Sequence, residues 1–204
     1  MSENMDKVSY LVGRQVAGNL QQQGIEVELK KFFEGIEDGI NQKPLPMSNE
    51  EANQLLQEFD QQLQEKLAAK KRAFAEENLK LGQQFLADNK KEDGIQETVS
   101  GIQYRILTEA DGDKPKASDT VETHYEGKLI TGEVFDSSIQ RGQSVSFPVG
   151  GVIKGWQEVL QLMSVGSRWQ VFIPSHLAYG EQGSPPKIGP NSVLEFEIEL
   201  INIV

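Results

Sequence analysis

Residues 1 to 45 carry hydrophobic side chains at intervals of three and four positions, the spacing of one face of an α-helix. The pattern predicts two helices, with a stop near Gly24 and an end before Pro44. The apolar positions are Val8, Leu11, Val12, Val16 and Leu20 in the first helix and Leu29, Phe32, Phe33, Ile36 and Ile40 in the second. Helices this short cannot enclose a core, so these faces must be buried against another surface. We predict a helical dimerisation domain over residues 1–46; packing on the C-terminal half of the chain is the alternative.

The next segment, from Ser48 to Asn89, has no proline and a single glycine, Gly82, and it is rich in good helix formers. Ser48 is followed three positions later by Glu51, the spacing of a capping box. A helix of this extent would be roughly 60 Å long. Beyond Leu63 its apolar stripe thins to one residue per heptad, whereas a sustained coiled coil needs two. Residues 47–93 are therefore predicted to form a long linking helix whose far half is an exposed strut.

After Gly101 the hydrophobic period changes to two, which indicates β-strands. The alternating runs are 102–107, 121–126, 169–173 and 194–200. Thr131-Gly132 marks a hairpin turn, and residues 156–162 are the only helical stretch long enough here to cover a sheet. An antiparallel sheet covered on one face by a short helix is an α+β arrangement. The predicted fold class is therefore α+β, with an all-helical N-terminal part and a long helix before a sheet domain over residues 94–204.

Charge and composition narrow the class of protein. A net charge of -11 opposes nucleic-acid binding, which depends on clustered Lys and Arg. The chain has no cysteine, which excludes disulfides and thiolate chemistry. No run approaches the roughly 20 apolar residues of a membrane span, and the first residues lack the basic start and apolar run of a secretory signal. The sequence thus predicts a cytoplasmic protein that binds neither nucleic acid nor membrane.

Groups for conventional catalysis are sparse. His124 falls on the polar side of its strand, and His176 lies in a loop, where a position at the rim of a site is the simpler interpretation. Metal ligation would need clustered His, Asp or Glu, and Asp111 and Asp113 alone are ordinary loop residues. Gly150-Gly151 lacks the Lys and Ser or Thr that follow in a phosphate loop. We predict neither a metal nor a cofactor.

Five short motifs follow one another between residues 123 and 180. They are 123–127 (Thr-His-Tyr-Glu-Gly), 134–138 (Val-Phe-Asp-Ser-Ser), 152–156 (Val-Ile-Lys-Gly-Trp), 163–166 (Met-Ser-Val-Gly) and 178–180 (Ala-Tyr-Gly). In order and spacing they closely resemble the FKBP-type peptidyl-prolyl cis-trans isomerases, and the match covers residues 101–204. By its layout, the helical part before them resembles the dimerisation arm of the macrophage-infectivity-potentiator branch. The resemblance implies an FKBP-like fold and an enzyme that accelerates rotation about X-Pro bonds without a cofactor.

The resemblance also implies which residues form the site. The catalytic residues would be Asp136, Tyr179, Phe135 and Ile153. The residues that bind substrate would be Tyr125, Arg141, Phe147, Val152, Trp156, Ile188 and Phe196. Singly, Trp156, Phe196 and Val152 would look the same as simple core residues. An acid directly after Phe135 on an apolar strand needs partners, which Arg141 and Tyr125 could supply.

Partners follow from the same resemblance. The expected substrates are unfolded or partly folded proline-containing proteins, held in the cleft of a homodimer with a chaperone-like action. Tacrolimus and rapamycin are expected inhibitors, bound more weakly than by the best family members because Val145 and Lys187 replace usual pocket contacts. One alternative is a chaperone or prolyl-peptide binding module whose isomerase activity is incidental. Another is a structural dimer whose C-terminal domain only presents a surface.

Overall fold

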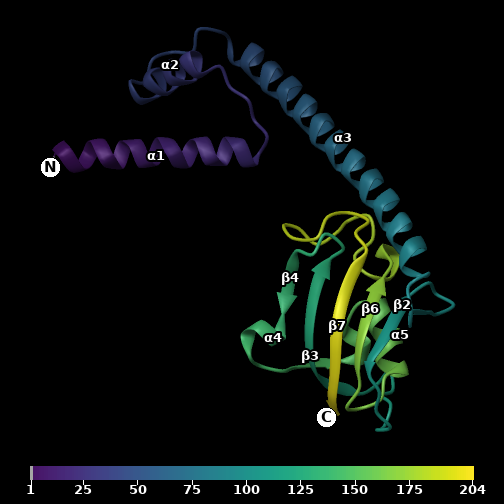
Figure 1. Ribbon diagram of the computed structural model, residues 1–204. Coiled ribbons are helices and arrows are strands. Elements are labelled where there is room, and N and C mark those ends of the chain that lie inside the picture. Colours follow the sequence, from purple (N-terminus) through teal and green to yellow (C-terminus); the bar gives the residue numbers. More distant parts are fainter. Residues whose placement is uncertain (1) are drawn as a thin grey trace. The chain divides into compact units, whose positions relative to one another are not determined.

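The computed structural model describes residues 2–204, and its contacts divide the chain into two compact units. The first unit runs to Lys70 and the second from Lys71 to Val204. The long helix α3 (Asn49–Asn89) has its first turns in one unit and its last turns in the other (Figure 1). The predicted α+β class is confirmed, because helices are followed by a single antiparallel sheet.

The first unit contains α1 (Ser2–Gln22), α2 (Leu29–Ile40) and the start of α3. The sequence explains where these helices begin and end. Gly24 takes a left-handed conformation with φ 70° after α1. The carboxylate of Glu28 accepts hydrogen bonds from the backbone N–H groups of Lys30 and Lys31 at the start of α2. Ser48 Oγ accepts from the N–H of Glu51 at 3.1 Å, so half of the predicted capping box is formed.

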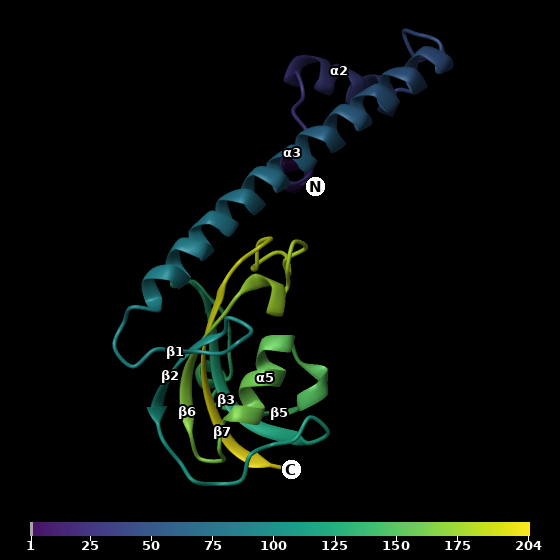
Figure 2. The same ribbon diagram turned by 90° about the vertical axis from the view of Figure 1, so that its right-hand side faces the viewer.

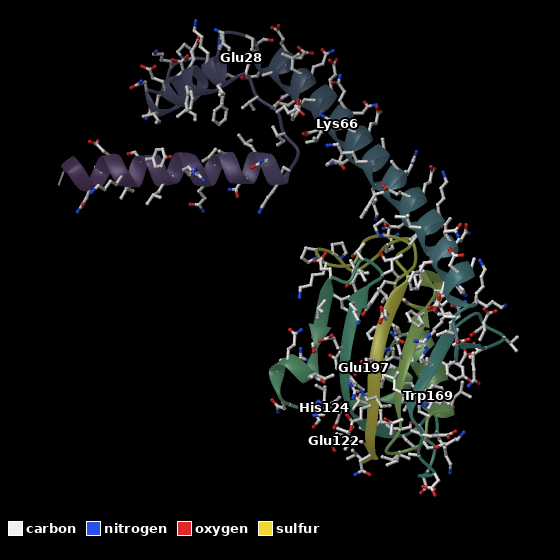
Figure 3. All side chains as sticks on the ribbon, in the orientation of Figure 1. Glu28, Lys66, Glu122, His124, Trp169 and Glu197 are labelled. Carbon is white, nitrogen blue, oxygen red and sulfur yellow. The ribbon has the colours of Figure 1, made fainter. Side chains whose placement is uncertain are left out.

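The side chains of the first unit are open to solvent. None of those described between residues 4 and 70 is buried. On the predicted apolar faces, Leu11 is 64% exposed, Phe33 61% and Ile40 76%. An ion pair at 2.8 Å joins Lys66 of α3 to Glu26, and the sticks of Figure 3 mark Lys66 and the cap Glu28. Such exposed pairs add little stability, so this unit has no core within one chain.

The second unit is built on a seven-stranded sheet in which every pairing is antiparallel. Its order is β1-β2-β6-β7-β3-β4, with β5 paired to β3. The strands are β1 (Gln96–Glu97), β2 (Gln103–Thr108), β3 (Thr120–Leu129), β4 (Val134–Ser137), β5 (Val145–Pro148), β6 (Arg168–Ile173) and β7 (Leu194–Ile203). The helices are α4 (Ser138–Arg141), α5 (Lys154–Leu162) and the 3₁₀ turns η1 (Val149–Gly151) and η2 (Ser175–Leu177).

The main core lies between the sheet and α5 (Figure 2). Alternate residues of β6, Trp169, Val171 and Ile173, face this core with Trp156 and Val159 of α5. The other face of β3 and β7 is polar, and Glu122, His124 and Glu197 stand on it in Figure 3. The predicted alternation is therefore confirmed.

The last turns of α3 pack on the second face of the sheet. Phe85 lies against Phe172, with ring centroids 5.5 Å apart, and Asn89 Nδ2 donates to Gln103 Oε1 at 2.9 Å. A Cβ on Gly82 would meet Val193 Cγ2 at 2.6 Å, so the lone glycine of α3 allows this close approach. The last turns of α3 are therefore docked on the sheet along one side, while Phe74 and Leu81 stay half exposed. The partner residues lie far along the sequence, where the pattern of the helix alone could not reveal them.

Candidate active site

A carboxylate and a guanidinium are brought together by β4 and α4. Ser137 ends β4 and caps α4, its Oγ accepting from the N–H of Gln140 at 3.1 Å. The helix has one turn and stops at Gly142, which is left-handed with φ 66°. This tight reversal returns Arg141 to Asp136, five positions earlier, and the two side chains form an ion pair. Local turn chemistry thus sets the geometry of the pair.

Tyr125 of β3 completes a three-residue polar group. Its hydroxyl donates to Asp136 Oδ2, while Arg141 Nη1 donates to Asp136 Oδ1 and Nη2 to the Tyr125 hydroxyl at 3.3 Å. Burial raises the pKa of Asp136, but the hydrogen bonds from Tyr125 and Arg141 outweigh it, and the pKa lies below its usual value. Burial and the bond to Asp136 raise the pKa of the Tyr125 hydroxyl. At neutral pH the group is therefore a carboxylate held by a neutral phenol and a cation.

Aromatic rings extend inward from this polar group. Trp156 touches Tyr125, Phe147 and Phe196 edge to face or nearly so, with centroids 5.3, 5.8 and 5.3 Å away. Phe135 meets Phe196 at 5.6 Å. The Trp156 indole N–H is buried and has no hydrogen-bond partner within the described residues. The result is an apolar cluster with the Asp136–Arg141 ion pair at its edge.

Two small residues that the sequence did not single out make this arrangement possible. A Cβ on Gly127 would meet the rings of Phe135 and Phe196 at 2.7 Å, so β3 needs glycine opposite them. The buried Ser138 accepts from the Tyr125 N–H at 2.7 Å and donates to its carbonyl at 3.2 Å. Ser138 thereby fixes the strand that carries Tyr125. Both positions fall within the quoted motifs, but only the structure shows what they contact.

The other predicted site residues occupy different depths. Val152 and Ile153 pack against the core cluster from the start of α5, and Ile153 is the N-terminal cap of that helix. Backbone N–H groups at a helix start have no partner within the helix and can donate elsewhere. Ile188 is 5% exposed and belongs to the core, whereas Tyr179 is 40% exposed and is not part of that cluster. The structure therefore joins all the predicted side chains except Tyr179, which stays at the surface.

Comparison with known proteins identifies the arrangement. A model of FKBP-type peptidyl-prolyl cis-trans isomerases matches residues 112–201, and one of the domain amino-terminal to them matches residues 5–106. Outer membrane protein MIP of Legionella longbeachae is 40% identical over 203 residues, which are 100% of this chain and 87% of that protein. The chain belongs to the FKBP family of peptidyl-prolyl cis-trans isomerases. The family, its macrophage-infectivity-potentiator-like layout and the enzyme class predicted from sequence are confirmed.

Other relatives of this FKBP-type isomerase agree along the whole chain. The FKBP-type 22 kDa peptidyl-prolyl cis-trans isomerase of Escherichia coli is 40% identical over 199 residues, 97% of this chain and 95% of that protein. The crystal structure of FkpA from Escherichia coli matches with a TM-score of 0.81 at 33% identity, covering 98% of this chain and 95% of the other. The similarity to these relatives therefore includes the helical part of the chain as well as the isomerase domain.

The predicted cytoplasmic location is wrong. A relative that matches the whole chain is named an outer membrane protein, which conflicts with the cytoplasmic assignment. Within the described residues, none of the helices is long and apolar enough to cross a membrane.

The loop between η2 and β7 adds a contact that the resemblance did not provide. Lys187 Nζ donates to the backbone carbonyl of Phe135 at 2.7 Å, which ties the loop to the residue before Asp136. Val145, the other residue expected to replace a usual pocket contact, packs against the core cluster. In this FKBP-type isomerase a lysine thus contacts the strand that carries two of the predicted catalytic residues.

Proposed function

We propose that this isomerase turns X-Pro bonds at the aromatic cluster around Trp156. The proline ring would lie against the buried indole, with the Asp136 carboxylate beside the rotating carbonyl. The Ile153 N–H and the Tyr179 hydroxyl would donate to the substrate backbone. The observation that carries the proposal is the Asp136 carboxylate, ionised and held by Tyr125 and Arg141 at the edge of an otherwise apolar cluster.

The chemistry needs no nucleophile. The partial double-bond character of the peptide bond sets a barrier of about 18–20 kcal/mol, and twisting the bond removes its resonance and charge separation. An apolar surface disfavours the planar, charge-separated ground state more than the twisted transition state. An acceleration of four to five decades requires about 5–7 kcal/mol, a size that desolvation and a few oriented dipoles can supply.

An NMR exchange or protease-coupled assay on a proline tetrapeptide tests these roles. We expect Phe135→Ala and Asp136→Ala to lower kcat/KM strongly while both variants unfold cooperatively. Glu133→Ala, on the exposed turn before β4, is the matched control and should turn over the peptide like the parent. Parental turnover by both site variants would refute the residue roles. Tacrolimus and rapamycin should inhibit, with Lys187→Ile raising their affinity.

We further propose that the enzyme is a homodimer joined through α1 and α2. The support is the apolar face of each helix, which one chain leaves exposed, as the fractions for Leu11 and Phe33 show. Burying two such faces against each other would supply the missing core. Two linked copies would hold one unfolded client at several weak sites and gain from effective concentration, up to ~10²–10⁴ in affinity. Chaperone-like binding by the cleft between the copies is thus part of the proposed function.

A further inference from the structure

A groove of about 1130 Å³ lies between the last turns of α3 and the face of the sheet turned away from α5. All of its lining residues belong to the second unit, and one of them, Lys187, also contacts a residue of the predicted active site. Its volume lies above the range of about 300–1,000 Å³ typical of small-molecule pockets. The groove therefore has room for several residues of a polypeptide.

The floor and one wall of the groove are apolar. Phe172 and Val193, 4% and 5% exposed, form the floor beneath α3. Phe74 and Leu81, seven positions apart and so on one side of α3, are 50% and 52% exposed. Large hydrophobic side chains that remain half exposed beside a groove are typical of surfaces that bind another chain.

The rim of the groove is acidic. Its carboxylates are Glu77, Asp88, Glu92, Glu133 and Glu195, and its cations are Arg105 and Lys187. Asp88 and Glu195 are paired with Lys91 and Lys128, but Glu77, Glu92 and Glu133 form no ion pair within the described residues. Lys187 donates to the Phe135 carbonyl. Unpaired acids around an apolar floor are complementary to a segment that carries both apolar and basic side chains.

One end of the groove adjoins the predicted active site through a single loop. Pro186, Lys187 and Gly189 line the groove. Ile188 between them is buried in the core that contains Trp156 and Phe196. Successive residues of this loop therefore face two different sites, and a chain leaving one could enter the other.

We infer that the groove is a second polypeptide-binding site, which takes an extended segment rich in apolar and basic residues. The apolar side chains lie against Phe74 and Leu81 above the floor of Phe172 and Val193, and the basic ones meet Glu77 and Glu133. The Arg105 guanidinium, which lines the groove and forms no ion pair within the described residues, donates to a peptide carbonyl. The binding itself is independent of the residue roles proposed above; only its use to hold a client beside the prolyl site rests on them.

The test uses the full chain and a labelled, short, proline-free peptide of Leu, Phe, Lys and Arg, with a counterpart in which Glu replaces each basic residue. Fluorescence anisotropy should show binding of the first peptide, weakened by salt, and much weaker binding of the second. Leu81→Glu should raise Kd by roughly 10-fold, and Glu77→Lys by ~3-fold because rim charges contribute less than apolar contacts.

Matched controls carry the same changes outside the groove. Glu76→Lys is on the neighbouring, equally exposed position of α3, and Leu107→Glu is on an exposed position of β2. Both should bind the peptide like the parent, and all four variants should turn over a proline tetrapeptide normally. If the parent and the variants bind the peptide as expected but none of them turns over the tetrapeptide, the proposed roles of the active-site residues are wrong and the groove proposal stands.

Two results would overturn the groove proposal. One is equal affinity of the basic peptide for the parent, Leu81→Glu and Glu77→Lys. The other is a change of sedimentation coefficient in the groove variants but not in the controls, because that would make the groove an interface between copies of this chain.

Discussion

Residues 4–70 and residues 71–204 contain similarly apolar segments but use them differently. In the second unit, Trp156, Val171 and Ile198 are buried between one helix and a sheet. In the first, Leu11, Phe33 and Ile40 stay exposed, although Glu28 caps the start of the helix that carries Phe33 and Ile40. Capping and periodicity make a helix, but only a partner surface gives it a core. The second unit carries its partner surface within the chain, and the first does not.

The largest effect should come from removing the unit that lacks a core. A chain that starts at Lys71 keeps the turns of α3 that pack on Phe172 and Val193, so it should fold and turn over a proline tetrapeptide at the full rate. It should be monomeric by light scattering and lose most of its ability to speed proline-limited refolding of a whole protein.

A point substitution isolates the same cause. Phe33→Glu places a charge on the apolar face of α2 and should shift the full chain toward monomer. The control Gln21→Glu places a charge on the exposed side of α1 that faces away from the apolar residues of α1, and it should not change the oligomeric state. A full chain that is monomeric without any substitution would end the dimer proposal and leave the isomerase assignment intact.

The next effect concerns the core of the second unit. Trp156→Ala removes a ring that touches Tyr125, Phe147 and Phe196, and it should cost about 3–5 kcal/mol of unfolding free energy, as large aromatic truncations do. It should also abolish peptide turnover. Urea unfolding followed by circular dichroism measures the first and NMR exchange the second. Loss of turnover with unchanged stability would mean that Trp156 is not the packing centre described above.

The sequence predicts the elements of both units well because their periods are local. It does not predict what the end of α3 contacts. The stripe Leu67, Phe74 and Leu81 has one apolar residue per heptad, but the residues of α3 that meet Phe172 and Val193 are Phe85 and Gly82, which lie outside that stripe. One clue was present: Phe172 is apolar on the face where β6 otherwise carries Arg168 and Gln170.

The candidate site shows the same division. The turn that returns Arg141 to Asp136 is readable from Ser137 and Gly142, because caps act locally. The contact of that pair with Tyr125 depends on strand register, which alternation along one strand does not fix. From the sequence alone, Trp156, Phe196 and Val152 could be either pocket residues or simple core residues, and only the resemblance to the family favoured the pocket.

A smaller effect tests whether α3 is docked on the sheet. Gly82→Ala in a free helix would be stabilising by about 1 kcal/mol. Here the new Cβ would lie 2.6 Å from Val193 Cγ2, and overpacking of this kind costs about 1–3 kcal/mol. We therefore expect a net loss of unfolding free energy in urea, restored by adding Val193→Ala. A stabilised single variant would show that α3 is free of the sheet in solution.

The smallest expected effect is a difference in pH and salt dependence between two ion pairs, Asp136–Arg141 in the second unit and Glu26–Lys66 in the first. The pKa of Asp136 is lowered in the folded protein, so its contribution to stability is present above the unfolded value of about 3.9 and is lost as pH falls through the folded pKa. Turnover should accordingly be flat from neutral pH down to about pH 5 and fall only in stronger acid. Arg141→Met removes one of the hydrogen-bonding groups that lower this pKa, together with its positive charge, so the acid limb should move to higher pH.

Glu26 provides the comparison in the first unit. Its pKa is also lowered, by the hydrogen bond from Lys66, but the Glu26 side chain is 86% exposed. The Asp136 side chain is 44% exposed, and salt screens exposed pairs more than partly buried ones. Added salt should therefore raise the pKa of Glu26 toward its ordinary value and raise that of Asp136 less. NMR titration of the two carboxyl carbons at low and high salt measures both in one sample. Equal salt shifts would mean that Tyr125 adds nothing to the Asp136–Arg141 pair, and the site would then be electrostatically no different from the open surface of the first unit.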